Sequence, residues 1–210
     1  MLDAGVEMRE GWLWPKGDID TWPTVWQEVR EEMPVILSLV PHKGVCVQAG
    51  GNGGLWVRPL AEAFETVYTF EPDALCFRCL AYNVTEPNVI KMQAALGDRH
   101  QMIAVDKWCG ERNHGAQRID IGKGAVPMLR IDDLALSRLD LLQLDIEGAE
   151  GLALEGARYS IAAHKPVIVL ELRNHAQRYG HTDSDIRNIV TGMGYRMHKR
   201  ICHDEIFLPA

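Results

Sequence analysis

The stretch Gly44-Val45-Cys46-Val47-Gln48 is followed at once by Ala49-Gly50-Gly51-Asn52-Gly53-Gly54. The first part is a short apolar run, which predicts a buried strand, and the second is a glycine-rich turn before a predicted helix. Glycines let backbone amides approach a ligand closely, and the helix directs the positive end of its dipole toward the turn. The stretch therefore predicts a strand, turn and helix that bind a nucleotide-like ligand, although a plain tight connection has the same pattern.

An acidic residue follows the next predicted strand, residues 67–70. There Glu71 can accept hydrogen bonds from both hydroxyls of a ribose, a requirement that S-adenosylmethionine and NAD share. A solvated loop carboxylate or a helix cap is the alternative for this residue. The dinucleotide fingerprint has glycines in the order G-x-G-x-x-G, whereas Gly50 and Gly54 frame the turn here. The spacing favours a ligand without a pyrophosphate.

From Gly44 onward, short apolar runs alternate with segments of helical period. This pattern predicts an α/β fold, a doubly wound and mostly parallel seven-stranded sheet of Rossmann-like type that ends in an antiparallel hairpin. We expect strands near residues 44–48, 67–70, 88–92, 140–145, 166–172, 194–200 and 205–208, and helices near 54–65, 73–83, 149–163 and 183–192. Residues 98–131 are rich in glycine, and we expect irregular structure with short hairpin strands there.

Four of the six tryptophans lie in the first forty residues, at Trp12, Trp14, Trp22 and Trp26. We expect residues 1–43 to form a helical extension packed on the core, with a helix from about Asp20 to Val40 that Pro34 kinks or divides. A lid over the substrate and a dimer surface are the alternatives. Residues 44–210 would then form the main domain.

The length and charge of the chain narrow its class. The 210 residues are enough for one well-buried core, and the net charge of -7 disfavours a nucleic-acid partner. There is neither an apolar run long enough to span a bilayer nor a signal-peptide pattern, so we expect a cytoplasmic protein without a membrane partner. The five cysteines, including the pair Cys76 and Cys79, are expected to be reduced and to serve packing rather than redox or metal chemistry.

Several motifs, taken in order, resemble those of the FkbM-type methyltransferases over roughly residues 44–175. They are Gln48-Ala-Gly50-Gly-Asn52-Gly-Gly54, Tyr68-Thr-Phe70-Glu71-Pro72-Asp73, Ala95-Leu96-Gly97-Asp98, Leu144-Asp145-Ile146-Glu147-Gly148-Ala149-Glu150, Leu154-Glu155-Gly156-Ala157 and Pro166-Val-Ile-Val-Leu170-Glu171-Leu172. The resemblance implies a class I methyltransferase fold, S-adenosylmethionine as the methyl donor, and methylation of an oxygen on a sugar, a polyketide or a similar small molecule.

The resemblance also implies which residues hold the donor. They are Gln48, Gly50, Gly51, Asn52 and Gly54 at the methionine and ribose, Glu71 and Pro72 at the ribose, Gln93, Ala94 and Ala95 at the adenine, and Asp145 at the mouth of the central strand. The family generally has an aspartate where this chain has Gln48. A glutamine can still accept a hydrogen bond from the ligand's ammonium, but it carries no charge opposite a cationic ligand. Altered donor binding is therefore one expectation.

Asp145 and Glu147 are the candidates for proton removal. Two positions apart on a continuing strand, they would share one face at its carboxyl end, where ligands bind in open α/β sheets. Asp145 is the first choice for general base, and Glu147, Glu171 and His175 are further candidates, with His181 also in reach of the same loop. The alternative for Glu147 is a plain helix start. Magnesium held by these carboxylates is conceivable, but the prediction is that no metal is bound.

Two other functions remain open. A non-catalytic protein that binds an adenosyl ligand is favoured by Gln48, and an NAD-linked oxidoreductase would need a pyrophosphate-compatible turn and a hydride site that the sequence lacks. A small-molecule acceptor is the expected partner, and self-association into a homo-oligomer remains open.

Overall fold

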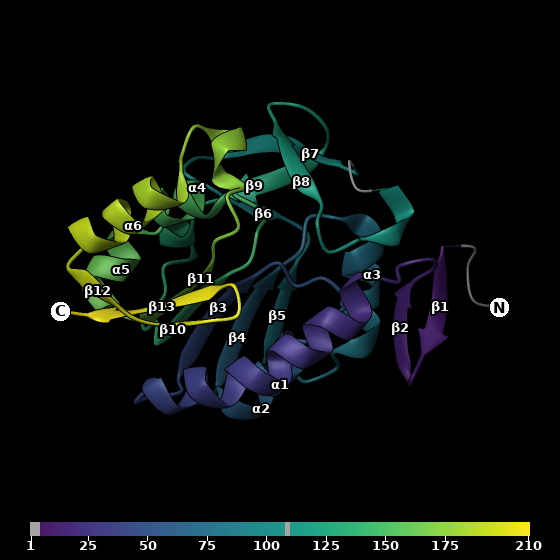
Figure 1. Cartoon of the computed structure of the whole chain (residues 1–210), viewed down its shortest axis with the longest axis horizontal. Helices are drawn as coiled ribbons and strands as arrows, with labels where there is room; N and C mark the ends of the chain where they lie inside the picture. The colour runs from purple at the N-terminus through teal and green to yellow at the C-terminus, as the bar shows by residue number, and fades with distance from the viewer. Residues whose placement is uncertain (1–4, 108–109) are drawn as a thin grey trace.

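The computed structural model describes residues 5–107 and 110–210, and only the backbone of Glu111. A seven-stranded sheet of order β12-β13-β11-β10-β3-β4-β5 lies between the helices at the centre of the structure (Figure 1). Its strands are β3 (Val45–Ala49), β4 (Thr66–Phe70), β5 (Val89–Met92), β10 (Leu141–Leu144), β11 (Val167–Glu171), β12 (Tyr195–Ile201) and β13 (Asp204–Pro209). All seven correspond to predicted strands.

The first five strands of this sheet in chain order are parallel, and β13 pairs antiparallel with both β11 and β12. The predicted seven-stranded, mostly parallel sheet with a terminal hairpin is confirmed. Successive strands move outward from β3 to β5 and then in the opposite direction from β10 to β11, so the order reverses between β3 and β10. A reversal of this kind opens a crevice at the carboxyl ends of the strands, where open α/β sheets bind their ligands.

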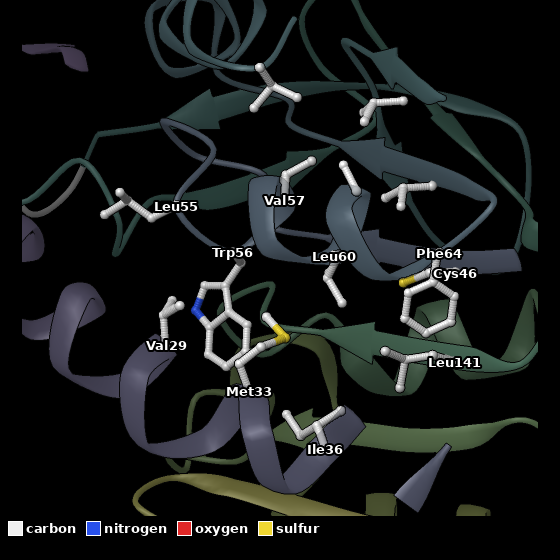
Figure 2. Close-up of a cluster of buried hydrophobic side chains, with 14 of the residues drawn as sticks. Val29, Met33, Ile36, Cys46, Leu55, Trp56, Val57, Leu60, Phe64 and Leu141 are labelled. Atoms are coloured by element: carbon white, nitrogen blue, oxygen red, sulfur yellow. The ribbon is translucent and has the colours of Figure 1, made fainter. Parts of the chain in front are cut away.

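Helices cover both faces of the sheet. The helices are α1 (Thr21–Leu39), α2 (Val57–Ala63), α3 (Ala74–Asn83), α4 (Glu150–Glu155), α5 (Arg158–His164) and α6 (Asp183–Gly192), with single 3-10 turns at Gly110–Arg112, Ile131–Leu134 and Ala176–Tyr179. Strand side chains alternate between faces. Cys46, Leu141, Val167 and Val169 belong to the cluster with α1 and α2, and Val47, Leu142, Ile168 and Leu170 to the cluster with α4, α5 and α6. Figure 2 shows Val29, Met33 and Ile36 of α1 facing Trp56, Leu60 and Leu141.

The helix predicted over residues 149–163 is two helices, α4 and α5, and the reason lies at Gly156. A Cβ atom on Gly156 would lie 1.9 Å from the carbonyl oxygen of Gly97. The carbonyl oxygen of Gly156 accepts a hydrogen bond from the amide of Asp132 at 2.9 Å. The chain therefore bends where Gly156 contacts Gly97 and Asp132. The helix predicted to begin at residue 54 begins at Val57, because the glycine turn extends further than expected.

The N-terminal segment contains a hairpin that the sequence did not predict, formed by β1 (Val6–Arg9) and β2 (Trp12–Pro15). The hairpin lies beside α3 (Figure 1), where the Asn83 side chain donates to the carbonyl of Leu13 and accepts from its amide. Trp12 and Trp14 are therefore strand residues, and α1 runs through Pro34 without dividing. The division of the chain at residue 43 stays a prediction.

The segment between β5 and β10 forms a second, four-stranded sheet of order β6-β9-β7-β8. Its strands are β6 (Ala95–Leu96), β7 (Gln101–Asp106), β8 (Arg118–Ile121) and β9 (Val126–Leu129), where short hairpin strands were expected. Cys109 lies outside the described residues, and Cys46, Cys76, Cys79 and Cys202 are free thiols. None of the helices in the described parts of the chain is long and apolar enough to span a bilayer.

Candidate functional site

Two adjoining cavities lie at the carboxyl ends of β3, β4, β10 and β11. The narrow cleft is lined on one side by Gly50, Glu71, Pro72, Ala94 and Ala95, and on the other by the segment from His114 to Ile119. The wide cavity, of about 430 Å³, is lined by Gly50, Gly51, Asn52, Glu71 and residues of α1, β10 and β11. Gly50, Glu71, Asp145 and Glu147 line both cavities, which makes them the junction of the site.

The turn after β3 can contain only glycine at its first position. Gly50 has φ +86°, and a Cβ atom there would lie 1.9 Å from the carbonyl oxygen of Asp145. The amides of Gly50 and Gly51 both donate to the carbonyl of Phe70, each at 3.0 Å. Strands β3, β4 and β10 are thereby held together at the point where the cavities begin, and Gly51 and Asn52 form part of the wide cavity's wall.

Gln48, Gly54 and Gln93, three of the predicted donor-binding residues, do not line either cavity. The buried Gln48 side chain accepts a hydrogen bond from the Thr69 hydroxyl at 2.6 Å and donates to the carbonyl of Gly50 at 3.0 Å. Its oxygen is thus directed at β4 rather than at a ligand. Gly54 packs against Leu80 and Val84. Gln48 and Gly54 thus help to shape the turn, Gln93 is exposed after β5, and the predicted contacts of all three with the ligand stay predictions.

Glu71 is directed into the junction between the cavities, as its predicted role requires. One carboxylate oxygen accepts from the amide of Asn52 at 2.7 Å and the other from the amide of Asp73 at 2.8 Å. Burial raises the pKa of Glu71 to about 7, although these two amides favour the ionised form. The carboxylate is therefore fixed in orientation, and its remaining lone pairs are available to hydroxyl donors.

Asp145, Glu147 and Glu171 meet at the inner end of the wide cavity. Their carboxylate oxygens lie within 4.8 Å of one another. Asp145 and Glu171 share a hydrogen bond, and burial raises the pKa of both, that of Glu171 to about 12. Arg173 contacts Glu171 at 2.8 Å through Nε. Two buried carboxyl groups this close disfavour each other's ionisation, so the pair favours a single shared proton. The predicted absence of a metal stays a prediction.

His175 joins this group, and His181 does not. Nδ1 of His175 lies 2.6 Å from Oε2 of Glu147, and His175 lines the wide cavity. Glu147 has the left-handed φ of +57°, a backbone conformation that non-glycine residues rarely adopt. His181 instead contacts Gly151 of α4. The four residues predicted as catalytic, Asp145, Glu147, Glu171 and His175, are therefore brought together.

The sequence did not identify the outer wall of the wide cavity, which α1 supplies through Thr21, Thr24, Val25 and Glu28. Glu28 pairs with Arg173 at 3.0 Å, and burial raises its pKa to about 7. These positions are spaced three and four residues apart, so they share one face of the helix. Polar residues at this helical spacing, on a helix whose other side is apolar, are the signal that could have revealed this wall.

Comparison with known proteins was made by family and by structure. A family model described as the methyltransferase FkbM domain matches residues 59–197, more than half of the chain. A search among curated proteins found no match.

The solved structures similar to this chain include methyltransferase FkbM from Methylobacillus flagellatus KT, at 19% identity and a TM-score of 0.48, over 79% of this chain and 43% of that one. The chain thus spans less than half of that protein. Precorrin 8W decarboxylase from Methanobacterium thermoautotrophicum is similar at 13% identity and a TM-score of 0.53, over 87% and 90%. Magnesium protoporphyrin IX methyltransferase from Synechocystis PCC 6803, with bound S-adenosylmethionine, is similar at 14% and 0.50, over 93% and 86%. At these identities the likeness concerns the fold, which is the predicted class I methyltransferase fold.

Proposed function

The chain belongs to the FkbM methyltransferase family, and on this premise we propose that it transfers a methyl group from S-adenosylmethionine to a hydroxyl oxygen of a small molecule such as a sugar. The observation that supports the proposal most is Glu71. Two backbone amides fix its carboxylate at the junction of the two cavities. A carboxylate held in this way can accept hydrogen bonds from two neighbouring ribose hydroxyls without rearranging.

The residues around Glu71 fit the rest of the donor. Gly50, Gly51 and Asn52 present backbone without bulky side chains to the methionine part in the wide cavity. Ala94 and Ala95 offer an apolar wall to the adenine in the narrow cleft. Asp145 supplies negative charge on the side of the sulfonium. Because Gln48 is directed away from the cavity, its replacement of the family's aspartate removes a charge without adding a contact.

When bound, S-adenosylmethionine supplies a methyl group on a positively charged sulfur. The chain must hold the acceptor hydroxyl in line with that group and take its proton. The ionised carboxylate of Asp145 is the proposed base, and protonated Glu171 orients it through their shared hydrogen bond. Glu147 and His175, in contact at 2.6 Å, form a second pair that can position the hydroxyl.

The site favours an uncharged or cationic acceptor over a nucleic acid. Glu28, Glu71, Asp145, Glu147 and Glu171 line the wide cavity together with one arginine. This surplus of carboxyl groups repels a polyanion, which binds to basic surfaces. We retain the proposal of a small-molecule acceptor on this ground.

Isothermal titration calorimetry with S-adenosylmethionine, S-adenosylhomocysteine and NAD tests the proposal. We expect both adenosyl ligands to bind and NAD not to. Glu71→Gln should weaken the binding of both by roughly 10- to 100-fold, because a hydrogen bond to a charged group contributes about 1.5–3 kcal/mol. Glu65→Gln, at an exposed carboxylate before β4, is the matched control and should bind like the wild type.

Turnover separates the enzyme from a binding protein. Methyl transfer from labelled donor to a panel of sugars and polyols should be measurable in the wild type. Asp145→Asn should reduce it by about 10²-fold or more, because a positioned base contributes that much. Donor binding without transfer to any acceptor would favour the non-catalytic alternative, and tighter binding of NAD than of either adenosyl ligand would contradict the proposal.

A further inference from the structure

Behind Glu28 the wide cavity adjoins a small recess. It is lined by Glu28, Glu32, Trp56, Asp145, Glu171, His203 and Asp204. Its volume is about 10 Å³, close to the 10–15 Å³ or so that one water-sized group needs. Glu28, Trp56, Asp145 and Glu171 line both the recess and the wide cavity, so a molecule in the wide cavity can extend one small group into the recess.

Carboxyl groups dominate the lining of the recess. Five of its seven residues are acidic, and the described lining offers a single imidazole, that of His203. Arg173, which contacts Glu28 and Glu171, approaches from the side of the wide cavity. The acids form two hydrogen-bonded pairs, Asp145 with Glu171 and Glu32 with Asp204. Burial raises the pKa of Glu32, Asp204 and Glu171 because it disfavours their ionised forms. A nearby positive charge offsets that cost, so a group of low positive charge suits the recess.

Glu32 provides the observation that points to a ligand. The residue is 2% exposed, and its Oε2 atom has no hydrogen-bond partner among the described residues. An unpaired buried acceptor is unfavourable and needs a donor. Glu28 and Glu32 lie one turn apart on α1, so both reach the same end of the recess. An ammonium group is about the size of a water molecule and has three donors, whereas a hydroxyl has one.

We propose that the recess binds the protonated amine of the methyl acceptor, which makes the acceptor a hydroxyl compound with a primary amine, such as an amino sugar. The inference rests on the proposed function, because it places the reacting hydroxyl in the wide cavity beside Asp145. The new bond joins the methyl carbon to the hydroxyl oxygen, the sulfur–methyl bond of the donor breaks, and the hydroxyl proton passes to Asp145. The nitrogen keeps its protons and does not react.

The test compares glucosamine with glucose and N-acetylglucosamine, which lack the charge but keep the hydroxyls. Binding of each sugar to the full chain is measured by ligand-observed NMR with S-adenosylhomocysteine present. Methyl transfer to each sugar is measured with labelled S-adenosylmethionine. We expect glucosamine to bind roughly ten-fold or more tightly than either neutral sugar, and the product to carry its methyl group on oxygen. Equal binding of the three sugars, binding of none, or a methyl group on nitrogen would overturn the proposal.

Glu32→Gln provides the second arm, with Glu31→Gln as the control. Glu31 is the neighbouring acid on α1 but is exposed. Glu32→Gln should abolish the preference for glucosamine and leave the affinity for S-adenosylmethionine unchanged, and Glu31→Gln should change neither. If Glu32→Gln does not fold, Glu28→Gln is expected to reduce the same preference. Binding of magnesium chloride that Glu32→Gln removes would assign the recess to a metal and overturn the amine. Loss of donor binding in the wild type would instead refute the proposed function itself.

Discussion

Glu71 and Glu150 are buried carboxyl groups whose partners are backbone amides rather than cations. Glu71 accepts from Asn52 and Asp73, and Glu150 accepts from the amides of Ile146 and Gly148 in the loop after β10. Burial raises the pKa of Glu71 to about 7 and that of Glu150 to about 8. Asn52 and Asp73 flank Glu71, and the loop after β10 contains Glu150's partners, so both carboxyl groups lie beside residues of the site. The stability of the site therefore depends on pH through the protonation of Glu71 and Glu150.

Glu150→Gln should change the dependence of stability on pH. The folded pKa of about 8 lies above the unfolded value of about 4.3, so the contribution of Glu150 is fully present below about pH 4.3 and is lost as pH rises to about 8. The glutamine keeps an acceptor oxygen but cannot ionise. The unfolding free energy of the variant should therefore gain on the wild type by roughly 1.4 kcal/mol per pH unit within that window. Urea unfolding between about pH 5 and 9 measures this.

Glu62→Gln, at an exposed position on α2, is the control for Glu150→Gln and should run parallel to the wild type. A constant difference between Glu150→Gln and the wild type at every pH would refute the assigned shift.

The sequence located Glu71 and the four residues at the cavity mouth because each lies at or shortly after the carboxyl end of a predicted strand. Parallel strands bring such residues to one edge whatever the details of packing. It could not show the orientation of Gln48, which depends on Thr69 of the neighbouring strand. It also failed at Glu28 and Glu32, because a helix far away in the sequence reaches the site only through tertiary packing. Sequence motifs indicate which residues lie at the ends of strands. They do not show which side chains from different elements contact each other.

Strands were easier to predict than the ends of helices. Each buried strand is an apolar run between turn residues, and that pattern is sufficient for a parallel sheet covered on both faces. The break between α4 and α5 depends instead on contact with Gly97, a residue in another part of the chain. The hairpin β1–β2 was not predicted, because the tryptophan-containing strand β2 shows no alternation of polar and apolar residues. All four residues of β2 are buried.

Gly156→Ala tests why the two helices separate. A Cβ atom there would lie 1.9 Å from a backbone oxygen, which cannot move away as a side chain can. We expect a loss of at least about 1–3 kcal/mol, the usual effect of overpacking a core, in urea unfolding. Gly192→Ala in α6 is the matched control, because nothing lies within 4 Å of the added atom. Gly192→Ala should be neutral or slightly stabilising, since alanine favours a helix, and equal losses in the two variants would rule out the contact as the cause.

At the scale of the whole molecule, the N-terminal tryptophans join the hairpin, α1 and the glycine turn. Trp14 packs edge-on against Trp22, with ring centroids 4.9 Å apart, and Trp22 against Trp26 at 5.8 Å. The indole nitrogen of Trp14 donates to Asp18, and a Cβ atom on Gly53 would lie 2.1 Å from its ring. The same hydrophobic cluster contains Trp56 just before α2, Leu60 of α2 and Val67 of β4. The N-terminal segment therefore supports the turn that borders the wide cavity.

Trp14→Ala should both destabilise the chain and weaken donor binding. The loss of a fully buried aromatic ring costs about 3–5 kcal/mol, and the glycine turn loses the surface on which it rests. Urea unfolding followed by tryptophan fluorescence and by circular dichroism should give coincident transitions, and calorimetry should show a lower affinity for S-adenosylhomocysteine. Tyr159→Ala, at a ring that is 77% exposed, should change neither. Two separate transitions, with unchanged affinity, would mean that residues 1–43 fold apart from the rest.

The outermost strand of the main sheet, β12, has one side without a neighbouring strand among the residues that the structure describes. Its exposed residues include Arg196, His198, Lys199 and Arg200, and a bulge interrupts its register between Met197 and Lys199. An incoming strand from a second molecule would meet like charges and an irregular ladder, both of which oppose edge-to-edge growth of sheets. The basic edge is thus of the kind that opposes aggregation, and we expect neutral residues in its place to make the strand a more favourable template for pairing with other chains.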